Sequence, residues 1–138
     1  MKLNVIDKSN YFKGLLLLVG KDKRISAEEK NWIKKVGKVL GFEKTFCEEA
    51  INNILYNKNI IDEPPAFSDK LFAQSFLKDG IKLAFADQEI NKNEHIFLEQ
   101  IAIKNNISPL WFRNELNNYS NRNNIFQKEI NLEVQNHI

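Results

Sequence analysis

Cysteine is nearly absent from this chain of 138 residues, and long apolar runs are absent altogether. The single thiol, Cys47, has no partner for a disulfide within the chain and no second cysteine with which to hold a metal. The longest apolar run, Leu15 to Val19, has five residues, whereas a bilayer span needs about 20. The start of the chain also lacks the apolar core of a signal peptide. These absences predict a soluble, unprocessed cytoplasmic protein without membrane insertion.

The chain also lacks a large excess of either charge, and it lacks recognised catalytic motifs. The 20 basic and 18 acidic residues give a formal net charge of +2, which is too small to predict a nucleic acid partner. The two histidines lie far apart in the sequence, and there is no nucleophile elbow, zinc-protease helix motif or phosphate-binding glycine loop. The sequence therefore argues against an enzyme.

Apolar side chains recur at helical spacing in the first half of the chain. A nearly all-apolar stretch predicts a central helix that begins after an N-cap at Asp7 or Ser9. Gly14 lies inside it, where a neighbouring helix can approach closely. Two amphipathic helices are expected next, over residues 27–40 and 44–57, and the second of them carries the single thiol on its apolar face as a buried structural group.

The second half of the chain begins with a break. Residues 58–67 hold two of the three prolines and show no apolar period, which predicts a linker. Ser68 is the expected N-cap of the fourth helix, and Ser108 that of the sixth. A seventh helix, over about 124–137, is predicted from apolar residues at i+4 spacing: Phe126, Ile130, Val134 and Ile138.

The pattern D-x-x-I-[SN]-x-x-E occurs twice, at residues 22–29 and 65 residues later at 87–94. Each copy ends in a predicted capping box, in which a serine or asparagine side chain and a glutamate three residues later satisfy each other's backbone amides. Aligned at this offset without a gap, the apolar positions stay in phase through three helices. The sequence therefore predicts two pseudo-symmetric copies.

These features predict an all-α protein, a compact bundle of about seven helices that forms a single domain over residues 1–138. The first three-helix repeat is expected at about 8–57, the linker at 58–67 and the second repeat at about 68–119. The C-terminal helix is expected to pack across the pair.

The duplicated turn resembles the signature of the TerB-like family, which is named for bacterial tellurite resistance. The resemblance covers about residues 8–119 and is carried by these residues: Asp22, Ile25, Ser26, Glu29, Ala86, Asp87, Ile90, Asn91 and Glu94. It implies a compact seven-helix bundle with its two acidic turns close together on one face. It also implies an accessory or adaptor domain of a bacterial stress-response or membrane-associated system, with a divalent cation at the turns.

Four carboxylates of the turns are the candidate metal ligands: Asp22, Glu29, Asp87 and Glu94. Hard divalent cations prefer several oxygen ligands, and His95 with Glu99 could add to the set. Helix capping and ordinary turn formation explain the same carboxylates without a metal. A calcium-binding EF-hand is excluded, because the positions of its first ligands hold Leu18 and Gly20. An enzymatic alternative also uses these carboxylates, to hold the metal of a hydrolase-like or phosphate-handling enzyme.

Lysines follow one face of the second predicted helix at i, i+4 and i+8. Together with one neighbour in the preceding turn, this stripe could dock an acidic partner or a phosphate backbone, or it could simply face solvent: Lys23, Lys30, Lys34 and Lys38. Trp32 lies on the apolar side, so the exposed aromatic rings of a nucleic acid site are missing. The leading hypothesis is a cytoplasmic, non-catalytic TerB-like module that binds a protein partner or an ion near the acidic turns.

Overall fold

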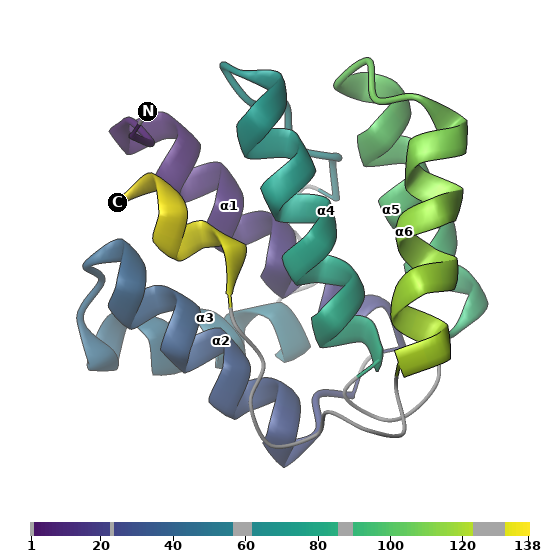
Figure 1. The fold of residues 1–138 in the computed structure, drawn as a ribbon. Helices are drawn as coiled ribbons and strands as arrows, with labels where there is room; N and C mark the ends of the chain where they lie inside the picture. Colours follow the sequence, from purple (N-terminus) through teal and green to yellow (C-terminus); the bar gives the residue numbers. More distant parts are fainter. Residues whose placement is uncertain (1, 23, 57–61, 86–89, 123–131) are drawn as a thin grey trace.

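The computed structural model describes residues 2–22, 24–56, 62–85, 90–122 and 132–138, and within these ranges all regular structure is helical (Figure 1). The predicted all-α class is confirmed. The elements are α1 (Val5–Val19), the 3-10 turn η1 (Gly20–Asp22), α2 (Ala27–Leu40), α3 (Lys44–Tyr56), α4 (Lys70–Ala84), α5 (Lys92–Lys104), α6 (Pro109–Arg122) and the 3-10 helix η3 (Glu133–His137).

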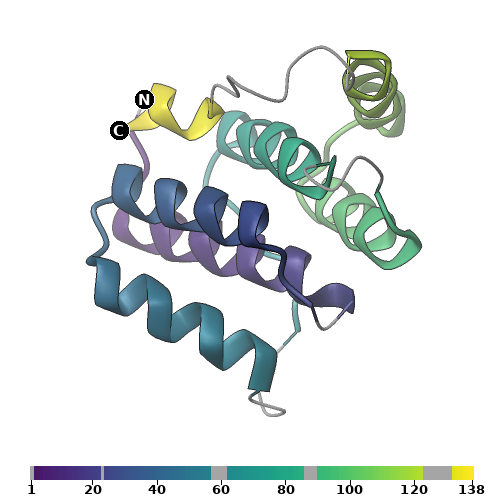
Figure 2. The ribbon, with the colours of Figure 1, turned by 90° about the horizontal axis from the view of Figure 1, so that it is seen from below.

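The helices repeat with the offset found in the sequence. Helices α1, α2 and α3 begin at residues 5, 27 and 44, and α4, α5 and α6 begin at residues 70, 92 and 109, which is 65 residues later in each case. Figure 2 shows the two sets of three helices as two groups side by side. Helix α1 lies between α2 and α3 on one side and α4 on the other, so the first helix of each copy forms the centre of the molecule.

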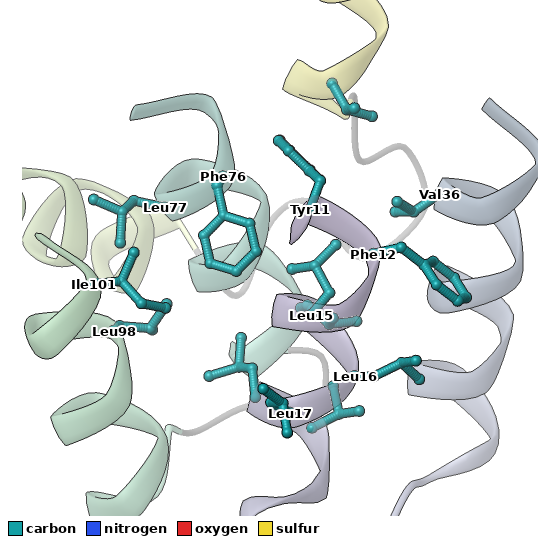
Figure 3. Packing of buried hydrophobic residues seen from close by; sticks show 14 of the residues in the cluster. Tyr11, Phe12, Leu15, Leu16, Leu17, Val36, Phe76, Leu77, Leu98 and Ile101 are labelled. Carbon is teal, nitrogen blue, oxygen red and sulfur yellow. The ribbon is translucent and has the colours of Figure 1, made fainter. Parts of the chain in front are cut away.

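Equivalent residues of the two copies meet where α1 packs on α4. The rings of Tyr11 and Phe76, which match at the offset of 65, lie edge to face with centroids 5.3 Å apart (Figure 3). Gly14 allows this approach, because a Cβ atom added there would lie 2.8 Å from the Phe76 ring. Equivalent positions of the two copies are therefore in direct contact at the centre of the molecule.

Two helices begin at residues other than the predicted caps. The side chain of Asn4 accepts the Asp7 amide over 2.7 Å, so α1 starts earlier than an N-cap at Asp7 or Ser9 would allow, and that prediction is wrong. Asp7 is buried and accepts hydrogen bonds from the amide and hydroxyl of Ser68. Because Ser68 is engaged there, Asp69 caps α4 instead, accepting an amide of its first turn over 2.8 Å.

The helix ends otherwise follow local sequence signals. Gly41 ends α2 with a φ of +89°, a conformation that favours glycine. Ser108 precedes α6, and its hydroxyl accepts an amide of the first turn at 3.4 Å. Helix α6 continues to Arg122, three residues past the predicted end of the second repeat. Residues 62–67 of the predicted linker form no regular element.

The C-terminal element differs in type from the predicted helix. Residues Leu132–Ile138, which we call the strap, contain the 3-10 helix η3 in place of the end of an α-helix, whereas 123–131 lie outside the described residues. The strap packs on α4 and α2, so it does bridge the two copies. The Leu3 amide donates to the His137 carbonyl over 2.9 Å, which brings the two ends of the chain together (Figure 1). These tertiary contacts hold the segment where an isolated helical turn would be unstable.

Candidate functional site

Both predicted capping boxes are present. The Glu29 amide donates to Ser26 Oγ over 3.1 Å, and the Ser26 amide donates to Glu29 Oε1 over 2.9 Å. Asn91 and Glu94 make the same pair of bonds at 2.8 and 3.1 Å. The two glutamates are almost completely buried. Each of them therefore begins a helix, which is sufficient reason for its place in the sequence pattern.

Two of the four predicted metal ligands are side chains that the structure does not describe. The Asp22 side chain and the whole of Asp87 lie outside the described residues, so only Glu29 and Glu94 of the four carboxylates have a defined position. Among the described side chains, no group of three or more histidine, cysteine, aspartate or glutamate residues is arranged to hold a metal ion. The two glutamates that are placed serve helix caps, and they alone do not make a cation site.

Loss of either cap should weaken the fold by a similar amount. We expect Ser26→Ala and Asn91→Ala each to lower the free energy of unfolding by about 1 kcal/mol, because each leaves an amide of the first helical turn without its acceptor. Urea denaturation followed by circular dichroism measures this change. Ser9→Ala, at an exposed position inside α1, is the matched control and should change the stability by less than about 0.5 kcal/mol. An effect of the control as large as that of the cap variants would contradict this role.

Between α5 and α6 lies a groove with a volume of about 160 Å³. Its walls are mostly apolar, and its polar residues are His95, Glu99 and Arg113, of which His95 Nδ1 lies 4.0 Å from Glu99 Oε2. The apolar lining consists of Ala102, Ile103, Ile107, Pro109, Phe112 and Leu116. Ile103 is 64% exposed, and Leu110 in the first turn of α6 is 62% exposed. Large apolar side chains exposed beside a concave apolar surface are typical of interaction sites.

The first copy carries different residues at the equivalent positions. The predicted basic stripe corresponds, at the offset of 65, to three residues of this groove: Lys30, Lys34 and Lys38 match His95, Glu99 and Ile103. Of the predicted stripe, Lys30 and Lys34 are half-buried and Lys38 is exposed, whereas Lys23 lies outside the described residues. Lys34 Nζ lies 3.9 Å from the Glu48 carboxylate, which links α2 to α3.

The two copies also differ in how closely their second and third helices pack. A Cβ atom added to Gly37 would overlap the Cys47 thiol, so α2 and α3 are in close contact there. Cys47 is buried, and burial, together with the Glu48 carboxylate, raises the pKa of its thiol. The equivalent residues in the second copy, Ala102 and Phe112, are larger, and both line the groove between α5 and α6. The groove between α5 and α6 thus includes the two positions that correspond to the close contact of α2 with α3.

The strongest polar centre is one that the sequence analysis missed. The Asp79 carboxylate is buried in α4 and accepts three hydrogen bonds: from the Tyr11 hydroxyl over 2.6 Å, the Glu133 amide over 2.6 Å and the Val134 amide over 3.0 Å. The two amides begin η3, so the carboxylate fixes the strap to the core. A helix N-terminus favours a negative group at this place. One signal was visible in the sequence: Asp79 continues the buried apolar face of α4 formed by Phe72 and Phe76.

Further contacts hold the rest of the strap. His137, which the sequence placed only in the tail, lies with Nε2 2.6 Å from Ser75 Oγ, and its ring packs edge to face on Phe72 with centroids 5.0 Å apart. Lys82 Nζ lies 3.6 Å from the Glu133 carboxylate. Val134 is completely buried. The strap is thus bound by two buried apolar side chains, Leu132 and Val134, and by polar contacts along its length.

Comparison of the chain with protein-family models, curated proteins and solved structures finds no match. Within the described ranges, each helix is too short or too polar to cross a membrane.

Burial changes the protonation of Asp79. Loss of solvent raises the pKa of this carboxyl from 3.8 to about 6, although the Tyr11 hydroxyl, the two strap amides and the Lys82 ammonium all favour its ionised form. The pKa of Tyr11 is raised well above its usual value, first by burial and then by the negative charge of Asp79.

A pH dependence of stability follows from this shift. Between pH 3.8 and about 6 the folded protein holds a proton on Asp79 that the unfolded chain releases, so the Asp79 contribution to stability falls as the pH rises through this window. We expect the stability of the wild type relative to Asp79→Asn to fall by about 2 kcal/mol from about pH 4 to about pH 7. Urea denaturation of both proteins at the two pH values tests this. A difference that is constant with pH would contradict the assignment.

Proposed function

We propose that this protein is a non-catalytic, TerB-like adaptor that binds an amphipathic helix of a partner protein in the groove between α5 and α6. The observation that carries the proposal is the apolar groove itself, with the largely exposed Ile103 on its wall. Helices dock in such grooves through apolar side chains spaced by one turn.

The size of the groove favours a side chain of a protein over a small molecule. Its volume of about 160 Å³ is well below the range of roughly 300–1,000 Å³ that is usual for sites of small ligands and cofactors. One or two large apolar side chains suit a groove of this size. Glu99 and Arg113 lie beside the apolar floor and have opposite charges, so they favour a helix with polar residues of both signs flanking its apolar face.

The comparison between the copies supports a binding role for this surface. Ile103 is largely exposed, and covering its apolar side chain with a partner would be favourable. Its counterpart in the first copy is Lys38, whose charged side chain is suited to water. The two copies share one scaffold and differ in polarity at the same position. The divalent-cation site that the TerB-like resemblance implies at Asp22 and Asp87 stays a separate prediction.

The proposal is tested by placing the lysine of the first copy at the equivalent position of the second copy, residue 103. Helical peptides are selected from a displayed random library on the wild-type protein, and their affinities are measured by fluorescence anisotropy. We expect Ile103→Lys to weaken the selected peptides at least about tenfold, because the apolar contact is lost and a charge is desolvated. Lys38→Ile makes the reverse change in the first copy and should leave binding within about twofold. Failure to enrich any peptide, or equal binding to Ile103→Lys, would overturn the proposal.

A further inference from the structure

We propose that a polar cleft between α4 and α6 binds a small zwitterion of the class of free amino acids, which carry an ammonium and a carboxylate group. The cleft has a volume of about 290 Å³, close to the lower end of the range that is usual for sites of small ligands. Its polar lining residues come from α4, α6 and the start of the strap: Lys78, Lys82, Glu115, Asn118, Tyr119 and Glu133. The cleft shares no lining residue with the α5–α6 groove, so this inference does not depend on the proposed function.

The two helices that form the cleft present opposite charges to it. Lys78 on α4 and Glu115 on α6 are both half-buried, and among the described side chains no ion pair joins them. Lys82 lies one turn after Lys78, and its Nζ atom is 3.6 Å from the Glu133 carboxylate. The Lys78 ammonium and the Glu115 carboxylate are thus left to meet a ligand. A molecule that bridges them needs a negative group at one end and a positive group at the other, which is the charge pattern of a free amino acid.

Two neutral side chains of α6 add hydrogen-bonding groups beside these charges. The Asn118 amide can both donate and accept. The Tyr119 ring packs against the Phe85 ring with centroids 5.4 Å apart, which holds it at the cleft. Burial raises the pKa of the Tyr119 hydroxyl, so this group keeps its proton at neutral pH and can donate to a carboxylate. A few placed polar groups of this kind orient a small ligand.

The first copy shows that the fold does not require these polar residues. Three of them correspond, at the offset of 65, to apolar residues: Lys82 to Leu17, Glu115 to Ala50 and Tyr119 to Ile54. The three apolar side chains belong to the hydrophobic core or pack against it. Partly buried charges at such positions cost free energy that apolar packing would not. Departures from the best packing are expected at functional sites, and the polar residues of the second copy therefore indicate a binding site.

Binding of the twenty common amino acids to the full chain tests the proposal. Each is screened at neutral pH by saturation-transfer NMR, and affinities are measured by isothermal titration calorimetry. We expect at least one to bind with a Kd below about 1 mM. Lys78→Met and Glu115→Gln should each weaken it at least about tenfold, because each removes the charge that pairs with one end of the ligand. Lys13→Met makes the equivalent change in the first copy and should leave binding within about twofold.

Ligands that lack one charge provide a second test that needs no variant. The N-acetyl and methyl ester forms of the bound amino acid should each bind at least about tenfold more weakly than the parent, and the N-acetyl form should bind equally to the wild type and to Glu115→Gln. Ile103→Lys should leave binding unchanged. Circular dichroism confirms that the variants are folded, and Lys78→Gln replaces Lys78→Met if the latter is not. The proposal would be overturned if no amino acid bound below about 1 mM, or if Glu115→Gln bound as tightly as the wild type.

Discussion

Phe76→Ala lowers the free energy of unfolding by about 4 kcal/mol, the largest effect that we expect from a single substitution in this protein. The ring is completely buried and contacts Tyr11 and Phe67 at centroid distances of 5.3 and 5.4 Å. Alanine removes these contacts and leaves a cavity where α1, α4 and the segment before α4 meet, and Gly14 has no side chain to fill it. Urea denaturation at neutral pH measures the change.

Leu71→Ala is the matched control for this substitution. Leu71 lies on the same helix but is 52% exposed, so its loss should lower the stability by less than about 1 kcal/mol. If Phe76→Ala were no more destabilising than Leu71→Ala, the contact between equivalent residues would not be the centre of the fold.

Asp79→Ala is expected to lower the free energy of unfolding by about 3 kcal/mol and to release the strap. Three donors lose their acceptor: the Tyr11 hydroxyl and the amides of Glu133 and Val134. Buried donors without partners each cost about 1–3 kcal/mol, although the released strap amides regain water and moderate the total. Hydrogen exchange should show fast exchange of the strap amides at denaturant concentrations at which α1 and α4 remain protected.

Asp62→Ala provides the comparison for an acidic residue at the surface. Its carboxylate pairs with Lys21 but is 57% exposed, and such pairs contribute less than about 1 kcal/mol. Unchanged protection of the strap amides in Asp79→Ala would show that other contacts hold the strap and that Asp79 is not its anchor.

Local signals were sufficient to predict most of the helices. Ser26 with Glu29 and Asn91 with Glu94 specify helix starts through neighbours three residues apart, and the structure contains both capping boxes. The offset of 65 residues likewise depends only on periodicity, and the starts of all six α-helices follow it. Where a cap depends on a distant residue, the prediction was wrong. Ser68 does not cap α4, since Asp7, 61 residues earlier, accepts its hydrogen bonds.

The strap could not be predicted for the same reason. The i+4 spacing of Val134 and Ile138 is compatible with an α-helix, but the segment is fixed by Asp79, 54 and 55 residues before the two amides it binds. No local pattern encodes such a contact. A carboxylate on an otherwise apolar helix face was the only sign of it in the sequence.

The groove shows the limit of sequence reasoning about sites. The lysine stripe was visible because charges repeat along one helix, whereas the groove is lined by residues of two helices, among them Ala102 and Phe112. Alignment of the two copies makes the difference apparent, since Ile103 stands where the first copy has Lys38. The duplication that defined the fold therefore also marks the position at which the copies differ in surface chemistry.

The most direct test of the proposed function is a map of amide chemical shifts in the ¹⁵N-labelled protein on addition of a selected helical peptide. The account predicts that the changes are confined to α5 and α6, are largest near Ile103 and Phe112, and disappear in Ile103→Lys. Changes centred on the lysines of α2 or on the capped turns at Ser26 and Asn91 would contradict it.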